Sequence, residues 1–250
     1  MTRSTPPRPP ETAIGAGNSA FPSTVWDVLS RLGRTGGDAN DINALAERYW
    51  RPVYKFIRVL WRKPVEDAKD LTQEFFATVF DEEFLKSVDR GKGNFRAFLK
   101  TALRNFLSDS HRASKTQKRG GGQVVFSLDP GPEEESIDPA VPEGDSEQAF
   151  DQMWAAEILR RALERLEEAY RIGGKAVRFE VFKRYCLEEG EPRSYKEVAA
   201  ELGLADHDVR NHLVAARQDL RGFCSQLIQE TVPNPGDIEE EMTLLFGRRP

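Results

Sequence analysis

Apolar side chains recur at three- and four-residue steps over much of the chain, which is the period of an amphipathic α-helix. From about residue 25 to residue 116 this pattern predicts several helices, the first of them ended by Gly36 and Gly37. Pro64 should end another helical segment, and Pro52 inside that segment either starts a new helix or kinks one. No useful length of chain alternates apolar and polar residues, so we expect an all-α fold.

A second helical region is predicted from about Phe150 to Thr231. Its first helix carries an apolar stripe at four-residue steps, which should face a core, and Gly173 and Gly174 should end it. Between the two regions, residues 120–146 contain four prolines and one short apolar island, a composition typical of a linker. The stripe consists of Phe150, Trp154, Ile158, Ala162, Leu166 and Tyr170.

Two small helical domains joined by a flexible acidic linker are therefore expected. The composition, with 39% hydrophobic and 31% charged residues, also favours small helical domains over one large core. The first residues are rich in proline, threonine, glycine and serine, which predicts disorder. The expected division is a disordered N-terminus at 1–20, a first domain at 21–119, the linker at 120–146, a second domain at 147–232 and an acidic tail at 233–250.

A helix-turn-helix is predicted near the end of the second domain. Ser194 followed by Glu197 has the spacing of a capping box, in which each side chain accepts a hydrogen bond from the other residue's backbone N–H. Gly203 stands where a tight turn needs a positive φ. A second helix should then start at Ala205 or Asp206, as in a pair of helices that binds the major groove.

That second helix should turn apolar residues inward and leave a polar face outside. Its N-terminal polar residues suit contacts with base edges in the major groove. The outer arginines are balanced by three aspartates, so the face has no net charge and could instead be a solvated surface. The inward residues are Val209, Leu213, Ala216 and Leu220, and the outward ones are His207, Arg210, Asn211, Val214, Arg217 and Arg221.

The charge of the chain changes sign abruptly between residues 66 and 119. Residues 66–83 hold seven acids against one lysine, whereas residues 86–119 hold ten basic residues against two aspartates. On the acidic helix, Asp70, Gln73 and Glu74 share one face, because they lie at i, i+3 and i+4. This face is either solvated or a docking surface for a protein, and the basic segment suits a polyanion.

Phosphate contacts are expected from the basic segment. Arg96, Lys100 and Arg104 recur at four-residue steps, and a loop with two glycines precedes them. An aromatic such as Phe95 could stack on an unpaired base beside that loop, although most aromatics here should be core. Further cations continue past the helix, namely His111, Arg112, Lys115, Lys118 and Arg119.

Cysteine and histidine usage does not suggest a metal centre. Cys186 and Cys224 lie in apolar helical contexts and should be reduced, buried thiols. The three histidines do not lie at the sequence spacing of metal ligands from these cysteines, so neither a metal nor another cofactor is expected. The N-terminus has no apolar segment of a signal peptide, and no stretch approaches the ~20 apolar residues of a membrane helix. We therefore expect a cytoplasmic protein without membrane insertion.

Five motifs together resemble one protein family. YWRPVYKFIR, EDAKDLTQEFF, GKGNFRAFL, LRNFLSDSHR and SYKEVAAELGL follow one another between about residues 22 and 232. In this order they are similar to an extracytoplasmic-function sigma factor of bacterial RNA polymerase. The resemblance implies a transcription initiation factor and not an enzyme, with core RNA polymerase and promoter DNA as partners. An anti-sigma factor is a third candidate partner.

The resemblance also implies a role for each candidate residue. The first domain would be sigma region 2 and the second sigma region 4, while the acidic linker would thread channels that later hold RNA. Docking on the clamp helices of the polymerase would use Asp70, Gln73 and Glu74. The −35 element would be read by His207, Arg210, Asn211 and Arg217. The −10 element would be opened and held by Asn94, Phe95, Arg96, Lys100, Arg104, Arg112, Lys115, Lys118 and Arg119.

Three other functions fit parts of the pattern. A plain helix-turn-helix regulator would bind duplex DNA without polymerase. A nuclease or nucleotidyltransferase would use Asp67, Asp70 and Glu74 to hold Mg²⁺, although no phosphate-binding glycine loop accompanies them. A sigma mimic would occupy an anti-sigma protein. The regulator would differ from a sigma factor by binding duplex DNA tightly without polymerase. The enzyme would differ by cleaving DNA in the presence of a divalent metal.

Overall fold

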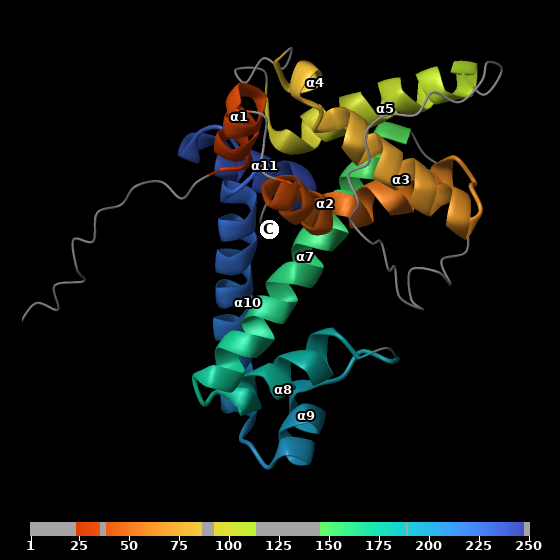
Figure 1. Cartoon of the computed structure of the whole chain (residues 1–250). Coiled ribbons are helices and arrows are strands. Elements are labelled where there is room, and N and C mark those ends of the chain that lie inside the picture. The colour runs from red at the N-terminus through yellow and green to blue at the C-terminus, as the bar shows by residue number, and fades with distance from the viewer. Residues whose placement is uncertain (1–23, 36–38, 87–92, 114–145, 189, 248–250) are drawn as a thin grey trace, which may run out of the picture.

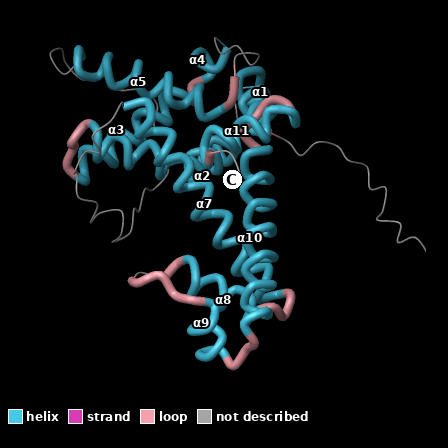
Figure 2. Tube along the Cα trace, turned by 180° about the vertical axis from the view of Figure 1, so that it is seen from behind, coloured by secondary structure: helices cyan, strands magenta, loops and turns pink. Residues whose placement is uncertain are grey.

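The computed structural model describes residues 24–35, 39–86, 93–113, 146–188 and 190–247. Within these ranges all regular elements are helices connected by turns and loops, which confirms the predicted all-α fold (Figure 2). The predicted disordered N-terminus and nearly all of the predicted linker lie outside the described residues.

The first half of the chain folds into a group of short and medium-length helices. Helix α2 continues through Pro52, so of the two alternatives for this proline the start of a new helix is wrong. Because proline has no N–H, the carbonyl of Arg48 lacks its helical partner there, a cost that the burial of α2 offsets. The helices are α1 (Val25–Thr35), α2 (Ala39–Leu60), α3 (Val65–Val79), α4 (Glu82–Lys86) and α5 (Phe95–Ala113).

Two long helices dominate the second half. Helices α7 and α10 lie side by side, and the short helices α8 and α9 pack at one end of the pair (Figure 1). At roughly 1.5 Å per residue, α10 with its 24 residues is about 36 Å long. The elements are α7 (Ser146–Ile172), α8 (Ala176–Cys186), α9 (Tyr195–Leu202), α10 (Asp206–Gln229), a 3₁₀ turn η1 (Pro235–Asp237) and α11 (Ile238–Phe246).

Two hydrophobic cores lie at opposite ends of the α7–α10 pair. The first combines residues of α1 to α5 with Phe150, Trp154 and Ile158 of α7 and with Leu227 and Ile228 of α10. The second is built from the other halves of the long helices together with α8 and α9. The two domains expected from the sequence therefore share a core in this arrangement, because α7 and α10 each contribute to both clusters.

Aromatic rings join α7 to the first half of the chain. Trp154, which is 1% exposed, stacks on Tyr49 of α2 with ring centroids 5.4 Å apart and an interplanar angle of 3°. The same indole meets Phe95 of α5 edge-on at 6.2 Å, and Phe150 packs against Phe56 at 5.6 Å. Rings of this size bury large apolar areas, so this contact should contribute strongly to stability.

The segment that follows α10 ties the helices of the first core together. The backbone N–H of Val25 donates to the carbonyl of Glu230 at 2.9 Å, and the N–H of Phe95 donates to that of Thr231 at 2.9 Å. The Glu230 carboxylate accepts from Arg48 of α2 at 3.0 Å and from Arg165 of α7 at 3.2 Å. The N-termini of α1 and α5 are thus fixed against the end of α10.

Candidate nucleic-acid interface

The α9–α10 pair has the local geometry that the sequence predicts. The Ser194 hydroxyl accepts from the Glu197 N–H at 3.3 Å, and the Glu197 carboxylate accepts from the Ser194 N–H at 2.7 Å. The N–H and the hydroxyl of Ser194 both donate to the Glu197 carboxylate, and these two hydrogen bonds lower the pKa of Glu197 because they favour its charged form. Gly203 then ends α9 with a φ of 65°, a conformation in which other residues are strained.

The outer face of α10 is open at its N-terminal end. His207, Arg210 and Asn211 are exposed, while Val209 and Leu213 are buried beneath them. The expected inward and outward faces of this helix are therefore confirmed in their main features. An exposed polar face on the second helix of such a pair is suited to base edges in the major groove.

Arg217 lies further along the same face and has partners within the protein. Its guanidinium lies 5.9 Å from the centroid of the Tyr185 ring and 3.8 Å from the sulfur of Cys186. Its side chain is nonetheless exposed. These contacts hold the guanidinium in one direction, which should lower the entropy cost of a phosphate contact.

The predicted docking face on α3 is accessible. Asp70 and Glu74 are exposed and Gln73 is half-buried, while Phe75 and Phe76 on the opposite side of the helix are fully buried. No helix of the described chain covers these carboxylates. The arrangement leaves a negatively charged surface on a helix whose other face is fixed by its core packing.

The cation that begins the predicted stripe on α5 does not face solvent. Arg96 is 4% exposed, and its Nε and Nη2 donate to the two carboxylate oxygens of Glu241 at 2.6 and 3.0 Å. Its Nη1 donates to Asp151. Burial lowers the pKa of Arg96, but the hydrogen bonds and charges of Glu241 and Asp151 raise it more. Arg96 therefore lacks the exposure that a phosphate contact needs, because two carboxylates already hold it.

The residues on either side of Arg96 are also occupied. Lys100 donates to both carboxylate oxygens of Asp151 at 3.1 Å. The amide nitrogen of Asn94 donates to Glu241, while its oxygen accepts from the Ala97 N–H at 2.8 Å and so caps α5. The Phe95 ring is fully buried in the first core, so it cannot stack on a base in this arrangement.

The remaining predicted cations differ in position. Arg104 is exposed on α5, one turn beyond Lys100. Arg112 lies in the last turn of α5, and its side chain is outside the described part of the chain. Lys115, Lys118 and Arg119 lie wholly outside the described residues. Cys224 is buried as expected, whereas Cys186 is exposed, because it lies at the open end of α8.

Sequence reasoning did not single out Glu241, Asp151 or Glu230. Glu241 is 3% exposed, although it belongs to a run of three acids in the tail. A usable signal was present, because Ile238, Met242 and Leu245 form an apolar stripe that includes position 241. An acid within an apolar stripe predicts a buried cationic partner.

The described residues do not form a metal-type cluster. Among them, no group of three or more histidine, cysteine or acidic side chains is placed to hold a metal ion, which includes Asp67, Asp70 and Glu74. None of the described helices is both long and apolar enough to span a bilayer. The arrangement thus consists of an open acidic face on α3, an open polar face on α10 and a covered face on α5.

Comparison with known families gives one match. A family model described as "ECF sigma factor" matches residues 32–225, which is well over half of the 250-residue chain. No curated protein and no solved structure matches the chain.

Proposed function

Because the chain belongs to the ECF sigma factor family, whose members are initiation factors and not enzymes, we propose that it binds core RNA polymerase and directs it to promoter DNA. The observation that carries this proposal is the extent of the match, which includes α3, α9 and α10 as far as residue 225. A helix-turn-helix regulator would need only the α9–α10 pair. The open carboxylates of α3 support a protein partner in addition to DNA.

Core docking is assigned to Asp70, Gln73 and Glu74. Asp70 and Glu74 are exposed, so their replacement by alanine should change the free energy of unfolding little, by no more than about 0.5 kcal/mol each, and the half-buried Gln73 is replaced together with them. Association with purified core polymerase should fall sharply. A matched control carries Glu167→Ala and Glu191→Ala, which remove the same two negative charges from exposed positions elsewhere. Equal association of the two variants would show that docking uses another face.

Recognition of the −35 element is assigned to His207, Arg210, Asn211 and Arg217 of α10. With Asp206, Asp208 and Asp219 on the same helix, the arginines leave no net positive charge for binding DNA by phosphate attraction. The free chain should therefore bind duplex DNA weakly, and specific binding should require core polymerase. Tight sequence-specific binding by the free chain at physiological salt would favour the plain regulator.

Opening of the −10 element is assigned to the start of α5 and the cations that follow it. Unpairing a base costs a few kcal/mol, so the protein must supply a pocket and a cationic path for the displaced strand. The residues given this role are Asn94, Phe95, Arg96, Lys100, Arg104, Arg112, Lys115, Lys118 and Arg119. A promoter already mismatched at −10 should partly rescue variants of these residues, and equal defects on both templates would mean that they support folding or docking.

A further inference from the structure

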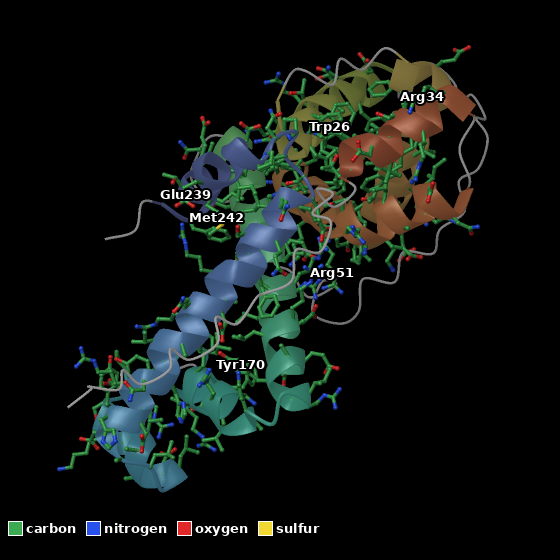
Figure 3. The ribbon with its side chains drawn as sticks, turned by 90° about the vertical axis from the view of Figure 1, so that its left-hand side faces the viewer. Trp26, Arg34, Arg51, Tyr170, Glu239 and Met242 are labelled. Carbon is green, nitrogen blue, oxygen red and sulfur yellow. The ribbon has the colours of Figure 1, made fainter. Side chains whose placement is uncertain are left out.

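The start of helix α5 and helix α11 are joined by a contact between buried or half-buried polar side chains. Three polar side chains, those of Asn94 just before α5 and of Arg96 and Lys100 on it, are held by carboxylates from distant parts of the chain. Glu241 comes from α11 and Asp151 from α7. Figure 3 shows α11, with Glu239 and Met242 labelled, at the end of the α7–α10 pair that is remote from Tyr170.

Glu241 binds Arg96 as a phosphate group would. Both carboxylate oxygens accept from the guanidinium, at 2.6 and 3.0 Å, and the Asn94 amide donates to the same carboxylate. Planar two-point recognition of this kind is shared by carboxylates and phosphates. A strand of DNA could therefore reach Arg96 only after Glu241 had left.

The surroundings of this contact also disfavour DNA. A cavity of about 340 Å³ lies beside Asn94, and its lining includes Asp237, Glu240 and Glu241 from the tail. These acids place negative charge next to the N-terminus of α5, where a phosphate would otherwise be favoured. Helix α11 thus covers the face with a carboxylate and surrounds its edge with further negative charge.

Apolar packing holds α11 in place. Met242 is 3% exposed and belongs to the first core, and Ile238 and Leu245 pack against that core. The exposed pair of Arg221 with Glu239 adds a second link between α10 and α11. The cover is therefore a folded element with its own hydrophobic face, and its removal would expose that face.

We propose that α11 is a built-in cover of the −10-binding face of α5, which lets the closed chain meet core polymerase while keeping it from single-stranded DNA. This inference rests on the proposed function. The docking residues Asp70 and Glu74 stay exposed when α11 is in place, so docking does not require the cover to leave. DNA capture at Arg96 does require it, because Glu241 of α11 and Asp151 of α7 hold the buried guanidinium.

The test measures binding of the free full-length chain to random-sequence, fluorescently labelled single-stranded DNA at about 50 mM salt. Glu241→Gln removes the α11 carboxylate that holds Arg96 and leaves Asp151 in place, whereas Glu240→Gln removes the same charge from an exposed neighbour on the same helix. Apparent affinity scales with the population of the binding-competent state, so Glu241→Gln should bind at least about tenfold more tightly. Glu240→Gln should change affinity by no more than about twofold, which measures general charge repulsion.

A second pair of variants, one that opens the cover and one control, leaves the charge of the chain unchanged. Met242→Ala removes the buried anchor of α11, whereas Leu244→Ala changes a residue that is 54% exposed. Met242→Ala should tighten DNA binding and Leu244→Ala should not. Adding Arg96→Gln to Glu241→Gln should abolish the gain, because the uncovered guanidinium is the source of the new affinity.

Association of each variant with core polymerase separates this proposal from the function on which it rests. If the unmodified chain does not bind core polymerase, the proposed function fails. If it does bind, and the four single variants have equal affinity for single-stranded DNA while circular dichroism shows them folded, the cover proposal alone is overturned. A gain that survives Arg96→Gln would overturn it as well.

Discussion

Removing the Trp154 side chain should test whether the two halves of the chain form one cooperative core. This indole lies between Tyr49 of α2, Phe95 of α5 and Phe150 of its own helix. Its ring N–H has no hydrogen-bond partner among the described residues. The change Trp154→Ala therefore removes packing and leaves a cavity, and it breaks no hydrogen bond of that side chain.

The expected cost follows from the burial of the ring. Trp154 is 1% exposed, and replacing a fully buried tryptophan by alanine typically costs about 3–5 kcal/mol. With a urea dependence of about 3 kcal/mol per M, the upper part of the usual range and suited to a chain of this size, the midpoint should fall by about 1–2 M. Trp154→Phe should cost less, because it keeps an aromatic ring and removes a buried donor that has no partner.

Urea unfolding followed by far-ultraviolet circular dichroism measures this effect. Leu159→Ala is the matched control, since Leu159 lies on the same helix and is 38% exposed. The control should lower the free energy of unfolding by only about 0.5 kcal/mol. Equal midpoints for the two variants would refute the shared core, because α7 would then contribute nothing to the stability of α2 and α5.

Four further predictions concern the second half of the chain. Ser194→Ala should lower the free energy of unfolding by about 1 kcal/mol through loss of the N-cap, measured by thermal or urea unfolding. Because the pKa of Glu197 is lower in the folded than in the unfolded chain, its negative charge should add to the free energy of unfolding. This contribution should be complete above the pKa that Glu197 has in the unfolded chain, and it should be lost as the pH falls through the pKa of the folded chain. Burial raises the pKa of Cys224 to about 11, so at pH 8 a thiol reagent should label Cys186 rapidly and Cys224 only upon unfolding, as mass spectrometry of the labelled chain would show. Arg210→Ala should cost about 1–3 kcal/mol of discrimination at one base pair in binding by the polymerase complex, and a uniform loss over all sequences would instead identify a phosphate contact.

Local features of the fold could be predicted from the sequence because short-range physics determines them. The apolar stripe from Phe150 to Tyr170 is buried as expected, since a four-residue period fixes which face of a helix meets the core. The capping box at Ser194 and the left-handed Gly203 are likewise present, because each depends on residues within one helical turn. The effect of Pro52 on its helix could not be predicted in this way, because tertiary packing decides whether a helix tolerates an internal proline.

The environment of α5 could not be predicted in the same way. A local count of charge gives residues 86–119 a strong positive excess, and this favoured an open cationic face. Arg96 is instead neutralised by Glu241, which is 145 residues away, and by Asp151, which is 55 residues away. The apolar stripe of α11 predicts a buried cationic partner for Glu241, but which cation that is depends on how α7 and α11 pack, and no local pattern encodes that packing.

Transcription reconstituted from purified components tests the central proposal most directly. The full-length chain would be added to core RNA polymerase and a library of bacterial genomic DNA, and the 5′ ends of the transcripts would be mapped. We predict defined start sites that share upstream −35 and −10 sequences and that appear only when the chain and core polymerase are both present. Transcripts that start at the same positions without the chain, or a chain that binds duplex promoters by itself and adds no start sites to core polymerase, would contradict its assignment as a promoter-directing sigma factor.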